Sequence, residues 1–141
     1  MVGVIIVAHL KLSEELLKAA RIISNSNLDN FKAVSINLND NPDQAREKIL
    51  AAVKSIDKDD GVLILVDMFG GTPSNLSLSL LEKGKTEIVT GANLPMIVEA
   101  AYSSQNVPLS ELVDILISGG QGGIRSAGEI LERKVVENKE S

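Results

Sequence analysis

Apolar residues fall into four short segments whose patterns are those of β-strands. Residues 2–8 and 62–66 are continuous apolar runs, which are typical of parallel strands covered on both faces. Residues 31–38 alternate between apolar and polar positions, which favours a strand nearer the edge of a sheet, and residues 86–91 fit a shorter, weaker strand. The pattern therefore predicts a sheet of four strands.

Between these segments the apolar residues recur at helical spacing, and polar residues mark the helix starts. Ser13, Asn41 and Thr72 each stand where a side-chain oxygen can cap a first helical turn, and a proline follows the second and the third of them. Two further helices are predicted over residues 95–104 and 109–118. Strand and helix thus alternate along the chain.

This alternation predicts a three-layer α/β domain with a mainly parallel sheet, strand order 2-1-3-4 and helices on both faces. We assign residues 1–123 to this domain and interpret the stretch SGGQGG, residues 118–123, as a flexible turn. Residues 124–141 form a C-terminal segment that fits either a short helix or one more strand. We expect its last charged residues to fray.

Composition narrows the classes of partner. The 141 residues carry a net charge of −5, two phenylalanines and one tyrosine, which argues against nucleic acid and anionic membranes. Cysteine is absent, so disulfides and thiolate metal sites are excluded. The N-terminus MVGVIIVAHL is interpreted as a strand rather than a signal peptide, and no apolar run approaches membrane-spanning length. We expect a soluble, cytoplasmic domain without direct membrane insertion.

Two polar residues stand at the carboxyl ends of predicted strands, where open parallel sheets bind ligands. His9, the only histidine, ends the first strand, and Asp67 follows the third. The order 2-1-3-4 puts these strands side by side, so we expect the two side chains to face each other. A carboxylate that accepts a hydrogen bond from one imidazole nitrogen leaves the other nitrogen free to act as a nucleophile.

The glycine turn after the third strand supplies groups suited to an anion. Gly70 and Gly71 let the backbone approach a ligand closely, and the helix start beyond them presents unpaired N–H groups. The Thr72 hydroxyl, the Asn75 amide and Ser13, which opens the helix after the histidine, complete the candidate phosphate-binding set. A histidine beside such a turn suggests a phosphohistidine, and we expect neither a metal nor a cofactor.

Each feature alone has a simpler interpretation. A single histidine is most often an ordinary surface or core residue, and an aspartate before a turn is often a turn or cap residue. The stretch GGTP is a good loop-to-helix junction and lacks the GK[ST] of a Walker motif. Their conjunction at the ends of two neighbouring strands is what favours a catalytic site.

Three stretches are characteristic of one family: GVIIVAH (3–9), GVLILVDMFGGTPSN (61–75) and TGANLPMIVEA (90–100). On these residues the chain resembles the IIA (EIIA) domain of the mannose/fructose-family sugar phosphotransferase system (PTS), in the family's order and spacing. The resemblance spans about residues 2–118. The VDMFGGTPSN block is far more specific than a generic glycine motif.

The resemblance implies roles and partners. The family's histidine, phosphorylated on Nε2, falls on His9; the aspartate that binds its Nδ1 falls on Asp67; and the hydroxyl beside the phosphoryl group falls on Thr72. The donor is the carrier HPr, charged from phosphoenolpyruvate by enzyme I. The acceptor is a histidine of a IIB component, with membrane subunits IIC and IID downstream. Members are cytoplasmic homodimers that exchange a C-terminal edge strand, which here would lie after about Ile124.

Two positions depart from the family pattern. Ala8-His9-Leu10 stands where Thr-His-Gly is common, and Gln121 stands near the last helix where an arginine is often found. Two alternatives stay open: the phosphotransfer subunit of dihydroxyacetone kinase, and a regulatory or ligand-binding module whose site has drifted. Labelling by HPr separates a carrier from a binding module. The sugar is not identified by the sequence.

Overall fold

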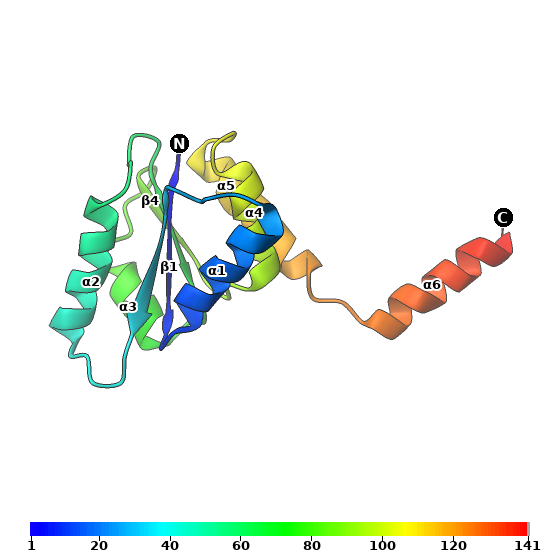
Figure 1. Cartoon of the computed structure of the whole chain (residues 1–141), viewed down its shortest axis with the longest axis horizontal. Helices are drawn as coiled ribbons and strands as arrows, with labels where there is room; N and C mark the ends of the chain where they lie inside the picture. Colours follow the sequence, from blue (N-terminus) through cyan, green and yellow to red (C-terminus); the bar gives the residue numbers. More distant parts are fainter. Residues whose placement is uncertain (141) are drawn as a thin grey trace.

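Strands and helices alternate along most of the chain, as the apolar pattern predicts (Figure 1). The computed structural model describes residues 1–140. In chain order the elements are β1 (Gly3–His9), α1 (Leu12–Ser24), β2 (Phe31–Ile36), α2 (Pro42–Lys54), β3 (Val62–Val66), α3 (Thr72–Leu78), β4 (Thr86–Val89), α4 (Leu94–Ser103), α5 (Leu109–Gly122) and α6 (Ala127–Glu140).

The four strands form one parallel sheet in the order β2-β1-β3-β4, which confirms the predicted order. Its central strands, β1 and β3, are buried along almost their whole length, as continuous apolar runs require. Val7 of β1 lies opposite Val66 of β3. The residues just beyond this pair therefore leave the sheet side by side, at the carboxyl ends of neighbouring strands.

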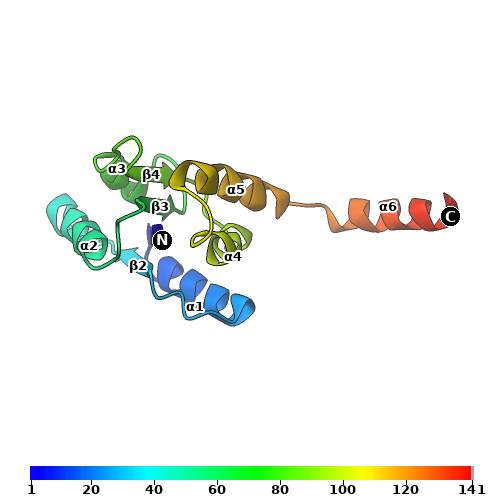
Figure 2. The same cartoon turned by 90° about the horizontal axis from the view of Figure 1, so that it is seen from above.

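Helices cover both faces of the sheet, which confirms the three layers. α1, α4 and α5 lie on one face, and α2 and α3 lie on the other (Figures 1 and 2). Along β1, Val4 and Ile6 join the first core, whereas Ile5 and Val7 join the second, because successive side chains alternate between faces. Each such buried side chain contributes about 1.5–3 kcal/mol relative to an exposed one, so the two central strands are held from both sides.

The start of α1 differs from the prediction. The helix begins at Leu12 with Lys11 at the N-cap position, so the assignment of Ser13 as a cap was wrong. Ser13 lies on the buried face of the helix, where its hydroxyl donates a hydrogen bond of 2.9 Å to the carbonyl oxygen of Val34 in β2. A buried hydroxyl needs a partner, and this one finds it in the neighbouring strand.

Of the two other predicted helix caps, the one at α2 is confirmed and the one at α3 is wrong. Asn41 caps α2 as predicted, and its side chain accepts a hydrogen bond of 2.8 Å from the backbone N–H of Gln44. At α3, however, Gly71 occupies the N-cap position and Thr72 is the first helical residue, so the prediction of a Thr72 cap was wrong. The Thr72 hydroxyl is therefore not committed to capping its own helix.

The stretch SGGQGG is not a flexible turn, because α5 continues through it as far as Gly122. A Cβ at Gly120 would lie 2.8 Å from Cε of Met96, and a Cβ at Gly119 would lie 3.1 Å from Cγ of Glu99. Both contacts are with α4. The glycines thus allow two helices to pack closely, which outweighs the low helix propensity of glycine.

Residues 127–140 of the C-terminal segment form a helix and not a strand. α6 projects away from the α/β body (Figures 1 and 2), so the predicted extra edge strand was wrong for residues 127–140. Apolar pairs at 130–131 and 135–136 are separated by charged residues, a spacing that suits a helix better than the alternation of a strand. Within residues 1–140, no helix is both long and apolar enough to cross a lipid bilayer.

Candidate active site

The carboxyl ends of β1 and β3 bring the two predicted catalytic residues together. His9 is the last residue of β1, and Asp67 follows the last residue of β3. Because the two strands are neighbours in register, the imidazole and the carboxylate meet, as the strand order predicts. We call the side of the sheet on which they lie the carboxyl edge, and the opposite side the amino edge.

Asp67 holds the histidine through one oxygen. Its Oδ2 lies 2.7 Å from Nδ1 of His9 and also accepts a hydrogen bond of 3.0 Å from the backbone N–H of that residue. The other oxygen, Oδ1, accepts one of 3.0 Å from the backbone N–H of Met68. Hydrogen bonds from two backbone N–H groups therefore hold the carboxylate in the position from which it orients the ring.

This contact decides which ring nitrogen is available. A carboxylate at Nδ1 accepts a hydrogen bond, so the neutral ring carries its proton there and keeps a lone pair on Nε2. The His9 side chain is 44% exposed, whereas that of Asp67 is only 11% exposed. The imidazole is thus open to solvent, whereas the carboxylate that contacts it is largely shielded from water.

Gly71 brings the glycine turn against the outer side of the ring. A Cβ at this residue would lie 3.0 Å from Cε1 and 3.5 Å from Nε2 of His9. Its φ of −84° is open to any residue, so close approach rather than backbone freedom calls for glycine here. At Gly70 the reverse holds, since φ is +86° and nothing lies within 4 Å of the position that a Cβ would take.

The other predicted phosphate-binding residues divide into two groups. Thr72 and Asn75 lie on the first turn of α3, directly after Gly71, and neither side chain is buried. The Ser13 hydroxyl is fully buried, and its single proton is donated to Val34. Ser13 as a side-chain donor to phosphate is therefore a prediction that the structure contradicts, because β2 already takes that donor.

Sequence reasoning named Leu10 as a departure from the family pattern and assigned no role to Met68 and Phe69. Leu10 has a φ of +53°, in the left-handed region that a branched side chain disfavours. Its side chain, like those of Met68 and Phe69, is more than half exposed. The exposure of these side chains belongs to the folded chain, whereas the glycine that is common in the family at the position of Leu10 is a sequence signal for positive φ.

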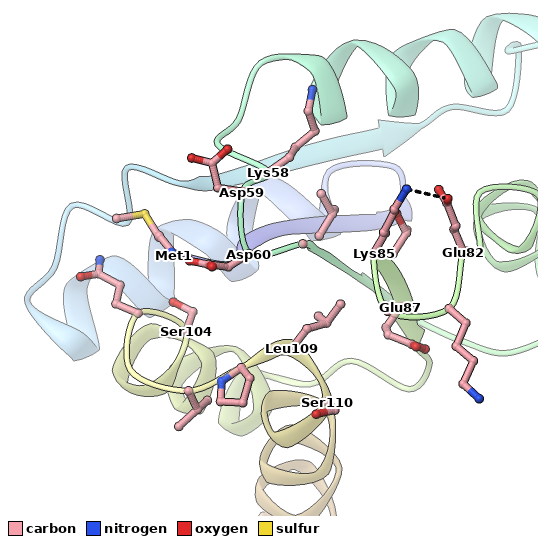
Figure 3. Close-up of a pocket in the computed structure, with 18 of the residues that line it drawn as sticks. Met1, Lys58, Asp59, Asp60, Glu82, Lys85, Glu87, Ser104, Leu109 and Ser110 are labelled. Atoms are coloured by element: carbon pink, nitrogen blue, oxygen red, sulfur yellow. Dashed lines mark hydrogen bonds and ion pairs between the residues drawn. The ribbon is translucent and has the colours of Figure 1, made fainter.

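A hollow lies at the amino edge, far from the paired histidine and aspartate. It is a cleft of about 1030 Å³ between the turns before β3 and β4 and the start of α5 (Figure 3). Some of its charged residues pair with one another: Lys85 lies 3.3 Å from Glu82, and the amino group of Met1 contacts Asp60. Among the described residues, no group of three or more His, Cys, Asp or Glu side chains could hold a metal.

One family matches most of the chain. It is the EIIA-man family, described as "PTS system fructose IIA component", and the match covers residues 3–117. This range includes the paired histidine and aspartate and the glycine turn. It stops short of α6.

Relatives and solved structures agree with this match. The mannose-specific EIIAB component of the phosphotransferase system from Escherichia coli (strain K12) is 30% identical over 127 residues, which cover 89% of this chain and 39% of that longer protein. The sorbose-specific EIIA component from Lacticaseibacillus casei is 30% identical over 115 residues, which cover 81% of this chain and 82% of the relative. A crystal structure of phosphotransferase system component EIIA from Streptococcus agalactiae superimposes with a TM-score of 0.81 at 26% identity, covering 92% of this chain and 99% of that one.

Proposed function

The chain belongs to the EIIA-man family of the sugar phosphotransferase system, and on this premise we propose that it is a cytoplasmic phosphocarrier. It accepts a phosphoryl group from phospho-HPr on His9 and passes it to a histidine of a IIB component. Sugar uptake and phosphorylation through membrane subunits IIC and IID then follow. The observation that carries the proposal is the 2.7 Å contact between Nδ1 of His9 and Asp67, which leaves Nε2 open.

The transfer step uses the neutral ring. The lone pair on Nε2 of His9 attacks the phosphorus in line while the bond between phosphorus and the donor's imidazole nitrogen breaks. The electron pair of the broken bond stays with the donor, which leaves as a neutral imidazole. The phosphorylated ring keeps its proton on Nδ1 and gains positive charge, which the Asp67 carboxylate balances.

Groups on the glycine turn offset the negative charge of the transferred phosphoryl group. Gly71 lies against the Nε2 side of the ring, and the N–H groups of Gly71 and Thr72 have no helical partner at the start of α3. The uncommitted Thr72 hydroxyl is a further donor, and the exposed Asn75 lies on the same turn. Preorganised donors of this kind stabilise a transition state because they need no reorganisation during the reaction.

We propose a homodimer as the assembly, with α6 as the element that joins the copies. Leu131 and Val135 lie on one side of this helix, are 62% and 52% exposed, and belong to neither core of the α/β body. Deleting the residues after Gly123 is expected to halve the mass measured by light scattering. A deletion variant that keeps the mass of a dimer would exclude α6 as the joining element.

The phosphocarrier is tested by labelling. The protein is mixed with enzyme I, HPr and phosphoenolpyruvate, and its intact mass is followed, with His9→Ala as the control. We expect one phosphoryl group that is labile in acid and absent from the control. Failure of the wild-type protein to take up the group, with HPr from the same organism, would contradict the proposal.

A further inference from the structure

The stretch TGANLPMIVEA (90–100) lies outside the paired histidine and aspartate and outside the glycine turn. It forms the loop after β4 and the first turns of α4, at the carboxyl edge. Since β4 is the neighbour of β3, this loop lies beside the strand end that carries Asp67. An effect of the loop on the site would therefore pass through the carboxylate.

A backbone hydrogen bond joins the loop to the strand that ends before Asp67. The N–H of Ala92 donates a hydrogen bond of 2.8 Å to the carbonyl oxygen of Val66. This carbonyl belongs to the planar peptide unit between Val66 and Asp67, so the bond restrains the plane from which the aspartate starts. Gly91, with a φ of +76°, lets the loop turn back to make this bond. The position of the carboxylate thus depends on where the loop is held.

Asn93 anchors the loop to two helices. Its Oδ1 accepts a hydrogen bond of 3.0 Å from the backbone N–H of Met96, which caps α4. Its Nδ2 donates one of 3.0 Å to the carbonyl oxygen of Gly120 in α5. Only this orientation of the amide satisfies both partners, because an N–H needs an acceptor and a carbonyl needs a donor. One side chain therefore ties the start of α4 to the end of α5.

The end of α5 is shaped to receive this contact. A Cβ at Gly120 would lie 2.8 Å from Cε of Met96 and 3.5 Å from Oδ1 of Asn93, and a Cβ at Gly123 would lie 2.6 Å from Cγ of Pro95. Side chains at these glycines would push the two helices apart. The glycines of SGGQGG therefore keep the carbonyl group of α5 within reach of the amide.

We propose, on the basis of the phosphocarrier function, that Asn93 is a positioning residue for phosphoryl transfer. By tying the loop after β4 to α5, it holds the peptide unit before Asp67 and, with it, the carboxylate at Nδ1 of His9. The Asn93 side chain bonds to two helices rather than to the ring, so it acts through the aspartate.

A small displacement of the carboxylate is enough to affect the ring. The contact between Asp67 and Nδ1 of His9 is 2.7 Å long, and a hydrogen bond weakens steeply when its geometry is disturbed. Without this acceptor the neutral ring is free to carry its proton on Nε2 instead. In that tautomer Nε2 has no lone pair with which to attack phosphorus.

The test variant is Asn93→Ser. Serine keeps an oxygen that caps α4 but is too short to donate to Gly120. Asn41→Ser is the matched control, because Asn41 follows β2 at the same edge and caps α2 through a hydrogen bond of 2.8 Å from the N–H of Gln44. Among the described residues, the Asn41 side chain bonds to no other helix.

Two measurements are made well below the thermal midpoint of each variant. The ¹⁵N signals of the ring nitrogens report which nitrogen carries the proton, and they are unambiguous because His9 is the only histidine. We expect the proton on Nδ1 in the wild type and in Asn41→Ser, and a mixture of both tautomers in Asn93→Ser. Rapid-quench transfer from saturating phospho-HPr should be about tenfold slower in Asn93→Ser, with the half-saturating donor concentration within about twofold of the wild type. Asn41→Ser should transfer at the wild-type rate.

Each outcome decides the matter. Mixed tautomers together with slowed transfer in Asn93→Ser alone support the proposal. Wild-type ring signals or a wild-type transfer rate in Asn93→Ser overturns it, since a residue that only stabilises the fold lowers the thermal midpoint without moving either readout. Equal changes in the two variants overturn it as well. The ring signals need no donor protein, so a wild-type protein that HPr does not label refutes the phosphocarrier function, while the spectra still decide whether Asn93 positions the ring.

Discussion

The two edges of one sheet carry opposite kinds of surface. At the amino edge, the turns before β3 and β4 are crowded with charges, among them Asp59, Asp60, Glu82 and Lys85, which surround an open cleft (Figure 3). At the carboxyl edge, an imidazole held by a shielded carboxylate lies among exposed apolar side chains. The same strands run through both edges, so the sheet alone does not explain the difference.

The two edges also differ in which residues take positive φ and which side chains face water. Turn glycines at the amino edge, such as Gly61 and Gly84, take positive φ without strain, and charged side chains there pair or face water. At the carboxyl edge Leu10 takes positive φ, and apolar side chains face water. Leu28, in the loop before β2, also takes positive φ, but it is buried in the core. Leu10 combines positive φ with an exposed apolar side chain directly after His9, as expected next to a functional residue.

Removing the negative charge of Asp67 should have the largest effect. Asp67→Asn keeps the size of the side chain but cannot balance a cationic ring, so we expect phosphoryl transfer from HPr to slow by about 100-fold or more. Rapid-quench kinetics with phospho-HPr measures the rate. Asp60→Asn at the amino edge is the matched carboxylate control and should transfer at the wild-type rate. Equal slowing in both variants would erase the distinction between the edges.

Gly3, at the amino end of the strand that ends in His9, should affect stability alone. A Cβ there would overlap Cδ1 of Ile56 and lie 2.9 Å from the carbonyl oxygen of Asp57. For Gly3→Ala we expect a loss of about 1–3 kcal/mol in the free energy of unfolding, as in other overpacked cores. Urea titration measures this loss. The transfer rate per folded molecule should stay unchanged, and a slowed rate would show that the two ends of β1 are coupled.

Gly71→Ala should affect phosphoryl transfer rather than stability. Its φ of −84° accepts alanine, but the added Cβ would lie 3.0 Å from Cε1 of His9 and displace the ring by a few tenths of an ångström. We expect transfer to slow by about tenfold, since small misplacements of reacting groups are costly, with the unfolding midpoint nearly unchanged. Gly70→Ala is the contrasting variant: its φ of +86° costs stability, and no His9 atom lies within 4 Å of the new Cβ. If Gly71→Ala transferred at the wild-type rate, the glycine turn would not be part of the site.

The smallest expected effect concerns pH and the loop that carries Leu38. The hydrogen bond from Lys48 holds the pKa of the Asp40 carboxyl below its usual range. A pKa lowered by folding means that the pair stabilises the protein above the ordinary aspartate value of about 4 and ceases to do so as the pH falls below it. Asp40→Asn should therefore be slightly less stable than the wild type at neutral pH and equally stable near pH 2, as followed by thermal unfolding. A constant difference at all pH values would assign the effect to packing.

The local pattern of apolar and polar residues predicted much of the sheet and the pairing of the two site residues. Continuous apolar runs predicted the two central strands, and alternation predicted β2, although that strand ends at Ile36 and leaves Leu38 exposed. Strand order then brought His9 to Asp67. These features could be predicted because residue period and strand ends are written within short stretches of sequence, and because parallel sheets have few allowed topologies.

What the tertiary structure alone decided depends on contacts between distant residues. In the sequence Gly119 and Gly120 indicate a turn. In the structure they lie within a helix, and their lack of side chains allows that helix to pack closely against α4. The sequence indicates Ser13 as a cap, but in the structure its hydroxyl donates to an acceptor in β2. The C-terminal segment fits strand and helix equally in the sequence, and the structure shows a helix that projects from the body. The strain at Leu10 and the closeness of Gly71 to the imidazole are likewise set by how the strands and turns pack. A sequence states local preference, and which preference prevails is decided by neighbours that only the fold brings together.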